Sequence, residues 1–336
     1  MLPKDVGFIV VYEPSPLFDT VFHDLTSHEN VYLVREIFDK NILRRLLKKR
    51  KIQKLTGGYL NFLVNEHFAL CRKLDEIADE YSEIWVLLLN YAFTTTQMPA
   101  SALQKLKEKF PHIKFALYYY DGVNTPASFL ADFVREKFNF DCVYTFEKTD
   151  AERYGLKFWP SPYSTLLNVP VQKVDKDLYF CGRSGNAVRR AIYLDVLDRC
   201  RENSVNADMD ILVLQDANYY NRFTDMARIH RAGDIVPYPQ VLERTLRAKC
   251  ILDVVLPYHT GLSLRPYEAV CYNRKLLTNN KSILDFPYYD SRYMQYFETV
   301  EEIDWDWVKE DIPVDYGYDC KFSPMRLLEH MVSFCE

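Results

Sequence analysis

The sequence predicts an α/β protein built from two Rossmann-like domains, and three observations lead to that prediction. The chain has 336 residues, a length at which a single hydrophobic core usually gives way to two. Two separate stretches each alternate strand-like and helix-like runs, the pattern of parallel sheets covered by helices. Between them, Trp159–Val174 contains three prolines and has no helical period. We therefore expect the domain boundary in that segment.

The first half begins with Val6–Tyr12, a continuous β-branched and aromatic run typical of a parallel strand buried on both faces. Further strand candidates follow it: Val31–Val34, Ile84–Leu89, Lys114–Tyr119 and Cys142–Phe146. Helix candidates lie between the strands: Lys40–Lys51, Tyr59–Glu80, Ser101–Lys109 and Pro126–Lys137. This order predicts a doubly wound N-terminal domain over residues 1–168.

The second half repeats the alternation. Its strand candidates are Leu178–Cys181, Ile211–Leu214, Ile251–Val255 and Lys275–Leu277. Its helix candidates are Ala187–Arg201, Gln240–Lys249 and Pro266–Tyr272. We expect a second Rossmann-like domain over 169–322. Ser323 then suits an N-cap and Pro324 a first helical position, which predicts a closing helix within 323–336.

Composition narrows the class of protein. A net charge of −5 argues against a surface built as a whole for nucleic acid, so no nucleic-acid partner is expected. The eight cysteines form no CxxC pair and have no histidine at metal spacing, which favours reduced thiols. No signal peptide is recognisable, and no stretch approaches the roughly 18 apolar residues of a membrane span. We expect a cytoplasmic protein.

Three predicted strands of the second half end in polar or glycine-bearing turns, and open α/β sheets bind ligands at such ends. The first turn is Gly182-Arg183-Ser184-Gly185. Two glycines let a backbone approach a pyrophosphate, while helix-start N–H groups with Arg183 or Arg189 supply positive charge. The spacing is not that of the dinucleotide G-x-G-x-x-G, which weakens the case for nicotinamide binding. The same turn is also typical of a plain βα connection.

The second turn, Gly261–Arg265, approaches a helix whose first residue is predicted to be Pro266. Glu268 would then be the third helical residue, where it either favours the helix dipole or accepts hydrogen bonds from ribose hydroxyls. The third turn starts with Thr278 and Asn279, which suit sugar-facing groups or plain turn formers. Tyr238 precedes another helix, where its ring is placed to cover a base.

These segments, in this order, resemble the C-terminal domain of GT-B glycosyltransferases, particularly those of bacterial capsule and lipopolysaccharide biosynthesis. The matching stretches are LYFCGRSGNAVRR, VPYPQVLERTLRAKCILDVV and HTGLSLRPYEAVCYNRKLLTNN. The resemblance covers roughly Asp121 to Tyr289, while the first hundred residues match only in general rhythm. It implies two Rossmann-like domains facing a cleft, with a nucleotide diphosphate sugar bound by the second domain and a glycan or lipid-linked glycan acceptor by the first.

The resemblance also assigns roles to single residues. It implies that Gly182, Arg183 and Gly185, with Ser184 and Arg189 beside them, contact the diphosphate. It implies that Tyr238 lies near the base, that the turn Gly261, Leu262 and Ser263 contacts phosphate, and that Glu268 binds the ribose. Thr278 and Asn279 complete the expected donor site. Many retaining members carry a second glutamate eight residues before the first; Thr260 occupies that position here, so a retaining outcome is not inferred.

An inverting transferase needs a general base in the first domain to deprotonate the acceptor hydroxyl. Asp121 is our first candidate because it closely follows a predicted strand, and Glu13, after the first strand, is the second. An aspartate at that position is also a common turn former. His259 and Arg265 are expected to stabilise the leaving diphosphate.

Two further features concern metal and membrane. Asp208-Met209-Asp210 imitates the DxD motif of another glycosyltransferase fold, but it lacks that fold's context and is interpreted as a coincidence. No cofactor or metal is therefore expected. The segment Arg44–Lys54 is strongly basic with apolar residues at helical spacing. It suits either peripheral contact with an anionic membrane or an ordinary solvated helix face.

The leading interpretation is a glycosyltransferase that moves a sugar to a hydroxyl of a bacterial surface glycan such as capsule, O-antigen or lipopolysaccharide. A nucleotide-sugar epimerase of the same fold is the second interpretation. A non-catalytic binding protein of a glycan-assembly complex is the third.

Overall fold

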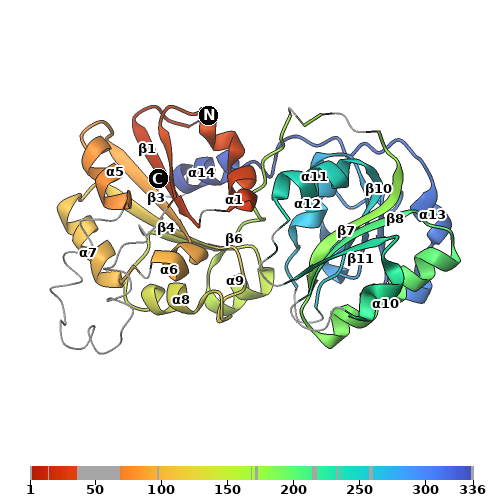
Figure 1. Cartoon of the computed structure of the whole chain (residues 1–336). Helices are drawn as coiled ribbons and strands as arrows, with labels where there is room; N and C mark the ends of the chain where they lie inside the picture. Colours follow the sequence, from red (N-terminus) through yellow and green to blue (C-terminus); the bar gives the residue numbers. More distant parts are fainter. Residues whose placement is uncertain are drawn as a thin grey trace. The chain divides into compact units, whose positions relative to one another are not determined.

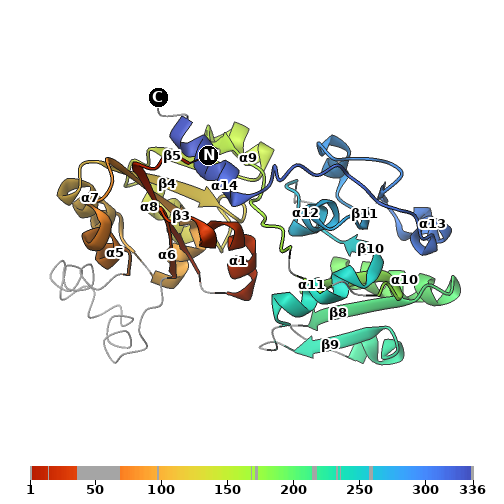
Figure 2. The same ribbon diagram turned by 90° about the horizontal axis from the view of Figure 1, so that it is seen from above.

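The computed structural model describes residues 2–333, except for 14, 36–68, 97, 168, 171–172, 214–217, 232–233, 235 and 257–259. The chain divides into two compact units: unit 1 is Met1–Ser164 with Ser323–Glu336, and unit 2 is Thr165–Phe322. Each unit contains one six-stranded sheet (Figures 1 and 2). Every neighbouring strand pair in both sheets is parallel, which confirms the prediction of two Rossmann-like α/β domains.

The sheet of unit 1 has the strand order β2-β1-β3-β4-β5-β6. Its strands are β1 (Val6–Tyr12), β2 (Val31–Arg35), β3 (Glu83–Leu89), β4 (Ile113–Tyr119), β5 (Cys142–Thr145) and the short β6 (Lys157–Phe158). All residues of β1 are buried, as its unbroken apolar sequence predicts for a strand covered on both faces.

The described α-helices of unit 1 are α1 (Pro16–Val21), α5 (Ala69–Ile77), α6 (Asn90–Thr96), α7 (Ala100–Lys109), α8 (Phe129–Arg135), α9 (Lys148–Tyr154) and α14 (Pro324–Ser333). Apolar residues of α5, α6, α7 and α8 pack in one core with the strands. The expected helix Lys40–Lys51 and the first part of Tyr59–Glu80 lie outside the described residues. Pro126 and Ala127 are not helical, and α8 starts at Phe129.

The short helix η1 (His23–Ser27) binds Ser164, where the chain leaves unit 1, and Ser323, where it returns. The backbone N–H of Asp24 donates to Ser164 Oγ at 3.0 Å, and Ser323 Oγ donates to the Asp24 carboxylate at 2.6 Å. Helix α14 follows Ser323 and lies beside the N-terminal segment in both views (Figures 1 and 2).

This division differs from the expected one in two ways. The chain crosses into unit 2 at Ser164 instead of residue 168. The closing helix, expected as a segment of its own, belongs to unit 1 because its apolar stripe of Leu327, Leu328 and Met331 is fully buried there.

The sheet of unit 2 has the order β12-β11-β10-β7-β8-β9. Its strands are β7 (Lys176–Ser184), β8 (Ala207–Val213), β9 (Ala227–Arg231), β10 (Ala248–Asp253), β11 (Lys275–Thr278) and β12 (Met294–Tyr296). The helices are α10 (Ala187–Glu202), α11 (Tyr238–Leu246), α12 (Leu264–Cys271) and α13 (Trp305–Lys309). Figure 1 shows α11 and α12 on one side of this sheet and α10 on the other.

Candidate functional site

The carboxyl ends of β7, β10 and β11 lie at one edge of the unit 2 sheet, because these strands are parallel neighbours. Asp253, the last residue of β10, joins the segments that meet there. It is 4% exposed and accepts hydrogen bonds from Ser263 Oγ at 2.8 Å and from Thr278 Oγ1 at 2.9 Å. Burial raises the pKa of the Asp253 carboxyl, although these two hydrogen bonds oppose the rise.

Sequence reasoning missed Asp253, although a signal was present. The residue is the one acid within the apolar run Cys250–Leu256, and a carboxylate at the end of a buried strand needs hydrogen-bonding partners. Its position makes it a scaffold for the turn before α12.

Helix α12 begins two residues earlier than predicted. Ser263 is its N-cap and accepts a hydrogen bond from the backbone N–H of Arg265 at 3.1 Å. The prediction that Pro266 is the first helical residue is therefore wrong, and Glu268 lies one turn into the helix. Proline is tolerated at Pro266 because N–H groups of a first helical turn have no partner within the helix.

Glu268 is 1% exposed, and both of its carboxylate oxygens bind protein side chains. The Tyr238 hydroxyl donates to one oxygen, and the Arg265 guanidinium forms an ion pair with the other. Arg265 also donates to the carbonyl of Cys181 at 3.0 Å. Burial alone would lower the pKa of Arg265, but several neighbouring groups, of which Glu268 acts most strongly, together outweigh burial and raise the pKa. A ribose hydroxyl reaches Glu268 only when Tyr238 or Arg265 moves.

The expected G-x-x-G turn is mostly strand. Residues Gly182, Arg183 and Ser184 continue β7 and pair with β8, which corrects the prediction that the strand ends at Cys181. A Cβ atom on Gly182 would lie 2.4 Å from the ring of Phe180, so the glycine makes room for that ring. Ser184 is buried, and its hydroxyl lies 2.6 Å from the Tyr220 hydroxyl.

Two arginines that form no salt bridge with the described residues, Arg183 and Arg189, lie where β7 passes into α10. After Gly185, Asn186 caps the helix by accepting a hydrogen bond from the Arg189 backbone N–H at 2.8 Å. Arg183 is exposed, and among the described residues no carboxylate pairs with it or with Arg189. The Arg189 Nε atom is buried and has no hydrogen-bond partner in the described part of the chain. A cation in this state is stabilised by an anion from outside.

Thr278 and Asn279, expected either to face a sugar or to form a turn, both bind protein groups at the carboxyl end of β11. Thr278 is buried and donates to Asp253. The Asn279 side chain accepts from the backbone of Val255 at 2.8 Å and donates to it at 3.1 Å. Gly261 contributes its carbonyl to Asn280 at 2.9 Å. The turn that includes Gly261, Leu262 and Ser263 is thus tied to the end of β11, while His259 lies outside the described residues.

The aspartates of the Asp208-Met209-Asp210 sequence lie in β8 and form ion pairs. Asp208 pairs with Arg228, and Asp210 pairs with Arg228, His230 and Arg244. Burial alone would raise the pKa of Asp210, but the hydrogen bonds from the Arg228, His230 and Arg244 side chains lower it overall. Within the described residues, no group of three histidine, cysteine or acidic side chains is arranged to hold a metal ion.

Two carboxylates lie near the carboxyl edge of the unit 1 sheet. Asp121, shortly after β4, accepts hydrogen bonds from the Tyr91 hydroxyl and from the Gly122 backbone N–H, both at 2.9 Å. Glu13 directly follows β1, and no described residue donates a hydrogen bond to it. Burial raises the pKa of the Glu13 carboxyl. Strand β3 separates β1 from β4, so the two acids come from different parts of the edge.

No protein-family model and no curated protein matches the chain. Several solved structures are similar to it. MnaA of S. aureus, solved with UDP, is 10% identical with a TM-score of 0.54, over 98% of this chain and 96% of that one. A Listeria monocytogenes protein assigned as a UDP-N-acetylglucosamine 2-epimerase is 9% identical with a TM-score of 0.50, over 99% and 97%.

A third similar structure is a single-site mutant of S. aureus TarM, in complex with fondaparinux, alpha-GlcNAc-glycerol and UDP. It is 11% identical with a TM-score of 0.51, and the match covers 82% of this chain and 58% of TarM. These likenesses establish the GT-B fold, with two Rossmann-like units. Among the described residues, no helix is both long and apolar enough to cross a membrane.

Proposed function

We propose that this protein is a glycosyltransferase that takes a sugar from a nucleotide diphosphate donor and transfers it to a hydroxyl of a glycan. The observation that carries the proposal is the positive charge of Arg183 and Arg189 at the carboxyl edge of the unit 2 sheet, with which no described carboxylate forms a salt bridge. A diphosphate supplies an anion for this charge, at the place where open α/β sheets bind ligands. Two similar structures, MnaA and TarM, contain UDP.

In the proposed donor complex, Arg183, Arg189 and the backbone around Gly185 bind the diphosphate, and the turn before α12 contacts it from the other side. Arg265 contributes less than a free arginine would, because Glu268 already neutralises its charge. Tyr238 and Glu268 contact the nucleoside only after their mutual hydrogen bond opens. His259 remains part of the proposal on sequence grounds.

For the general base, we propose a test of Asp121 against Glu13. Asp121 is held in one orientation by hydrogen bonds from Tyr91 and Gly122. Glu13 has no such donor among the described residues, and its raised pKa brings it closer to the working pH of a base. These properties favour Glu13, although Asp121 was the stronger candidate from sequence.

The finer parts of the proposal rest on the sequence resemblance. The acceptor is a bacterial surface glycan of the capsule, O-antigen or lipopolysaccharide kind, free or lipid-linked. The enzyme works in the cytoplasm, and the basic residues 44–54, which lie outside the described residues, bind the inner face of the membrane. It needs no metal, because arginines and helix N-termini carry the phosphate charge; activity unchanged by EDTA supports this point, and loss of activity contradicts it.

A nucleotide-sugar epimerase is the second candidate, because the match to MnaA runs over nearly the whole of both chains. Its discriminating test is incubation of the purified protein with UDP-N-acetylglucosamine and no acceptor. Conversion of the free donor to its 2-epimer favours the epimerase. Release of UDP that depends on an added glycan favours the transferase.

Donor binding is tested first, by thermal shift with UDP, GDP, CDP and their common sugar derivatives. A ligand at about 100 times its Kd stabilises the fold by about 2.7 kcal/mol, so a bound donor raises Tm clearly. Arg189→Ala is expected to abolish the shift. Arg201→Ala is the matched control, since Arg201 lies at the other end of α10 and pairs with Asp225. Absence of a shift with every nucleotide would refute the proposal.

A further inference from the structure

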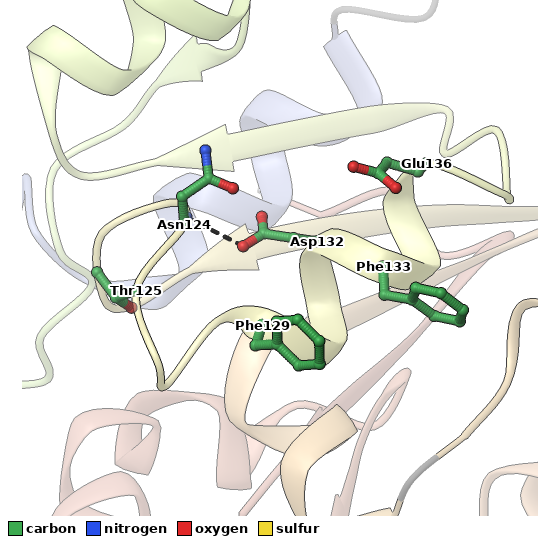
Figure 3. A pocket seen from close by; sticks show the side chains of 6 residues that line it. All are labelled: Asn124, Thr125, Phe129, Asp132, Phe133 and Glu136. Atoms are coloured by element: carbon green, nitrogen blue, oxygen red, sulfur yellow. Dashed lines mark hydrogen bonds between the residues drawn. The ribbon is translucent and has the colours of Figure 1, made fainter.

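Unit 1 contains a hollow that the donor site does not use. It is lined by Asn124, Thr125, Phe129, Asp132, Phe133 and Glu136 and has a volume of about 170 Å³ (Figure 3). The first two residues belong to the loop after β4, and the other four to α8 and its C-terminal end. The hollow therefore adjoins the carboxyl end of β4, three residues beyond Asp121.

Two aromatic rings on α8 are exposed beside this hollow. Phe129 is 66% exposed and Phe133, one turn later, is 49% exposed. Figure 3 shows both rings on the same side of the helix. The Lys137 ammonium covers one face of Phe133, with its nitrogen 3.7 Å from the ring centroid. Phe129 is thus the more accessible ring, and a ring this exposed gains free energy when an apolar surface covers it.

Polar groups surround the rings, and the backbone beneath them is fixed. Asn124 has a positive φ of 59°, and its backbone N–H donates to Asp132 at 3.0 Å. Asp132 is buried and also accepts a hydrogen bond from Tyr119 at 2.8 Å. Glu136 is exposed, and no described residue pairs with its carboxylate. The rim therefore offers the Glu136 carboxylate as an acceptor for hydroxyl groups.

Size and charge decide which ligand suits the hollow. Pockets for drug-sized ligands measure roughly 300–1,000 Å³, so this smaller hollow suits one ring and not a nucleotide. Of its two carboxylates, Asp132 lies 3.8 Å from the Arg135 guanidinium. Glu136 is exposed with no partner among the described residues, and its charge disfavours phosphates and anionic lipid surfaces. A pyranose satisfies both conditions, because it is uncharged, presents an apolar C–H face to an aromatic ring, and carries hydroxyls around its edge.

We infer that this hollow, the Phe129 subsite, binds one neutral sugar ring of the acceptor glycan. The ring stacks on Phe129, Phe133 closes the hollow, and Glu136 accepts hydrogen bonds from sugar hydroxyls. The inference rests on the proposed function for the identity of the ligand as an acceptor. The subsite itself is testable by sugar binding alone.

The test is ligand-observed saturation-transfer NMR on the full chain with the methyl glycosides of glucose, galactose, rhamnose and N-acetylglucosamine. A single ring should bind in the millimolar range. Saturation is expected at the C–H protons of at least one glycoside. Phe129→Ala should weaken its binding about tenfold, the size of a lost aromatic contact, and Phe129→Trp should preserve it. Glu136→Gln should weaken binding severalfold.

Phe158→Ala is the matched control, because Phe158 is an exposed phenylalanine of unit 1, 42% exposed, outside the hollow. It should bind sugars as the unchanged protein does. Equal affinity in Phe129→Ala and Phe158→Ala, or no signal from any glycoside, overturns the subsite. So does a Phe129→Ala variant that instead loses binding to anionic vesicles or changes oligomeric state.

Nucleotide thermal shifts on the same variants separate the two proposals. Intact nucleotide shifts without sugar binding defeat the subsite and leave the transferase. Sugar binding at Phe129 without any nucleotide shift defeats the transferase and leaves a glycan-binding surface.

Discussion

The Tyr238 hydroxyl donates a hydrogen bond to the Glu268 carboxylate, and this contact ties the first residue of α11 to the interior of α12. Both side chains were expected to contact a nucleotide, yet in this structure they bind each other below the surface. The contact therefore has a consequence for stability that can be measured without any ligand.

Tyr238→Phe is expected to lower the free energy of unfolding by about 1 kcal/mol, because it removes one hydrogen bond to a buried acceptor. Urea denaturation measures the change. Tyr219→Phe, at an exposed tyrosine of the same unit, is the control and should be neutral. A Tyr238→Phe variant of unchanged stability that binds nucleotide more weakly would show that the hydroxyl contacts the ligand instead.

Glu268→Gln is expected to cost more, about 3 kcal/mol, because it leaves the buried Arg265 cation without its counter-charge. The double variant Arg265→Met with Glu268→Gln removes both charges and keeps an acceptor for Tyr238. It should be more stable than Glu268→Gln alone. If the double variant is less stable than Glu268→Gln alone, the ion pair with Arg265 does not account for the contribution of Glu268 to stability.

Gly182→Ala should destabilise unit 2 by about 1–3 kcal/mol, since the added methyl group overlaps the Phe180 ring in a packed core. Phe180→Leu, which shortens the obstructing side chain, should recover part of the loss when it is combined with Gly182→Ala. Chemical denaturation of the two single variants and the double variant gives the coupling free energy. Additive losses would exclude the steric explanation.

The pH dependence of transfer distinguishes the two candidate bases. A base acts when it is deprotonated, and burial raises the pKa of Glu13, so kcat/KM should fall with decreasing pH at a higher pH than an ordinary glutamate would give. Glu13→Gln should lower kcat by about 100-fold or more and remove that acidic limb. Asp121→Asn should leave the limb in place. The opposite result for the two variants would assign the base to Asp121.

Acid should unfold the protein partly through Asp210. Its pKa is lowered in the folded state, so its contribution to stability is complete above the unfolded value near 4 and is lost as the pH falls toward the folded value. Unfolding free energies measured between pH 7 and pH 3 should therefore decline more steeply for the unchanged protein than for Asp210→Asn. Parallel curves would contradict this assignment.

The sequence predicted the fold well where patterns are local. The apolar run of β1 and the serine–proline start of α14 were both predicted correctly, because burial on two faces and capping leave direct signatures. The edge strands β9 and β12 were missed. Both strands are short. Most of their residues are only partly buried or exposed, so polar residues break the apolar run that marks a buried strand.

The site was harder to predict than the fold. From sequence, Gly182 resembles a glycine of a phosphate-binding loop. In the structure, a glycine is needed there because the ring of Phe180, two residues earlier, occupies the space of a side chain. That contact depends on the geometry of the strand. The partners of Glu268 come from α11 and from its own helix, and sequence does not show such tertiary pairing. Arg189 was identified from its place at a helix start, while the burial of its Nε atom required coordinates.

Asp24 binds both Ser164 and Ser323, the two residues that flank the segment forming unit 2. A ribosome that makes this chain releases all six strands of unit 1 first, then the whole of unit 2, and only afterwards α14. Until then, the apolar surface that Leu327, Leu328 and Met331 will cover stays open to solvent and to chaperones. Unit 1 therefore starts to be synthesised before unit 2 but completes its core only after unit 2 has been made.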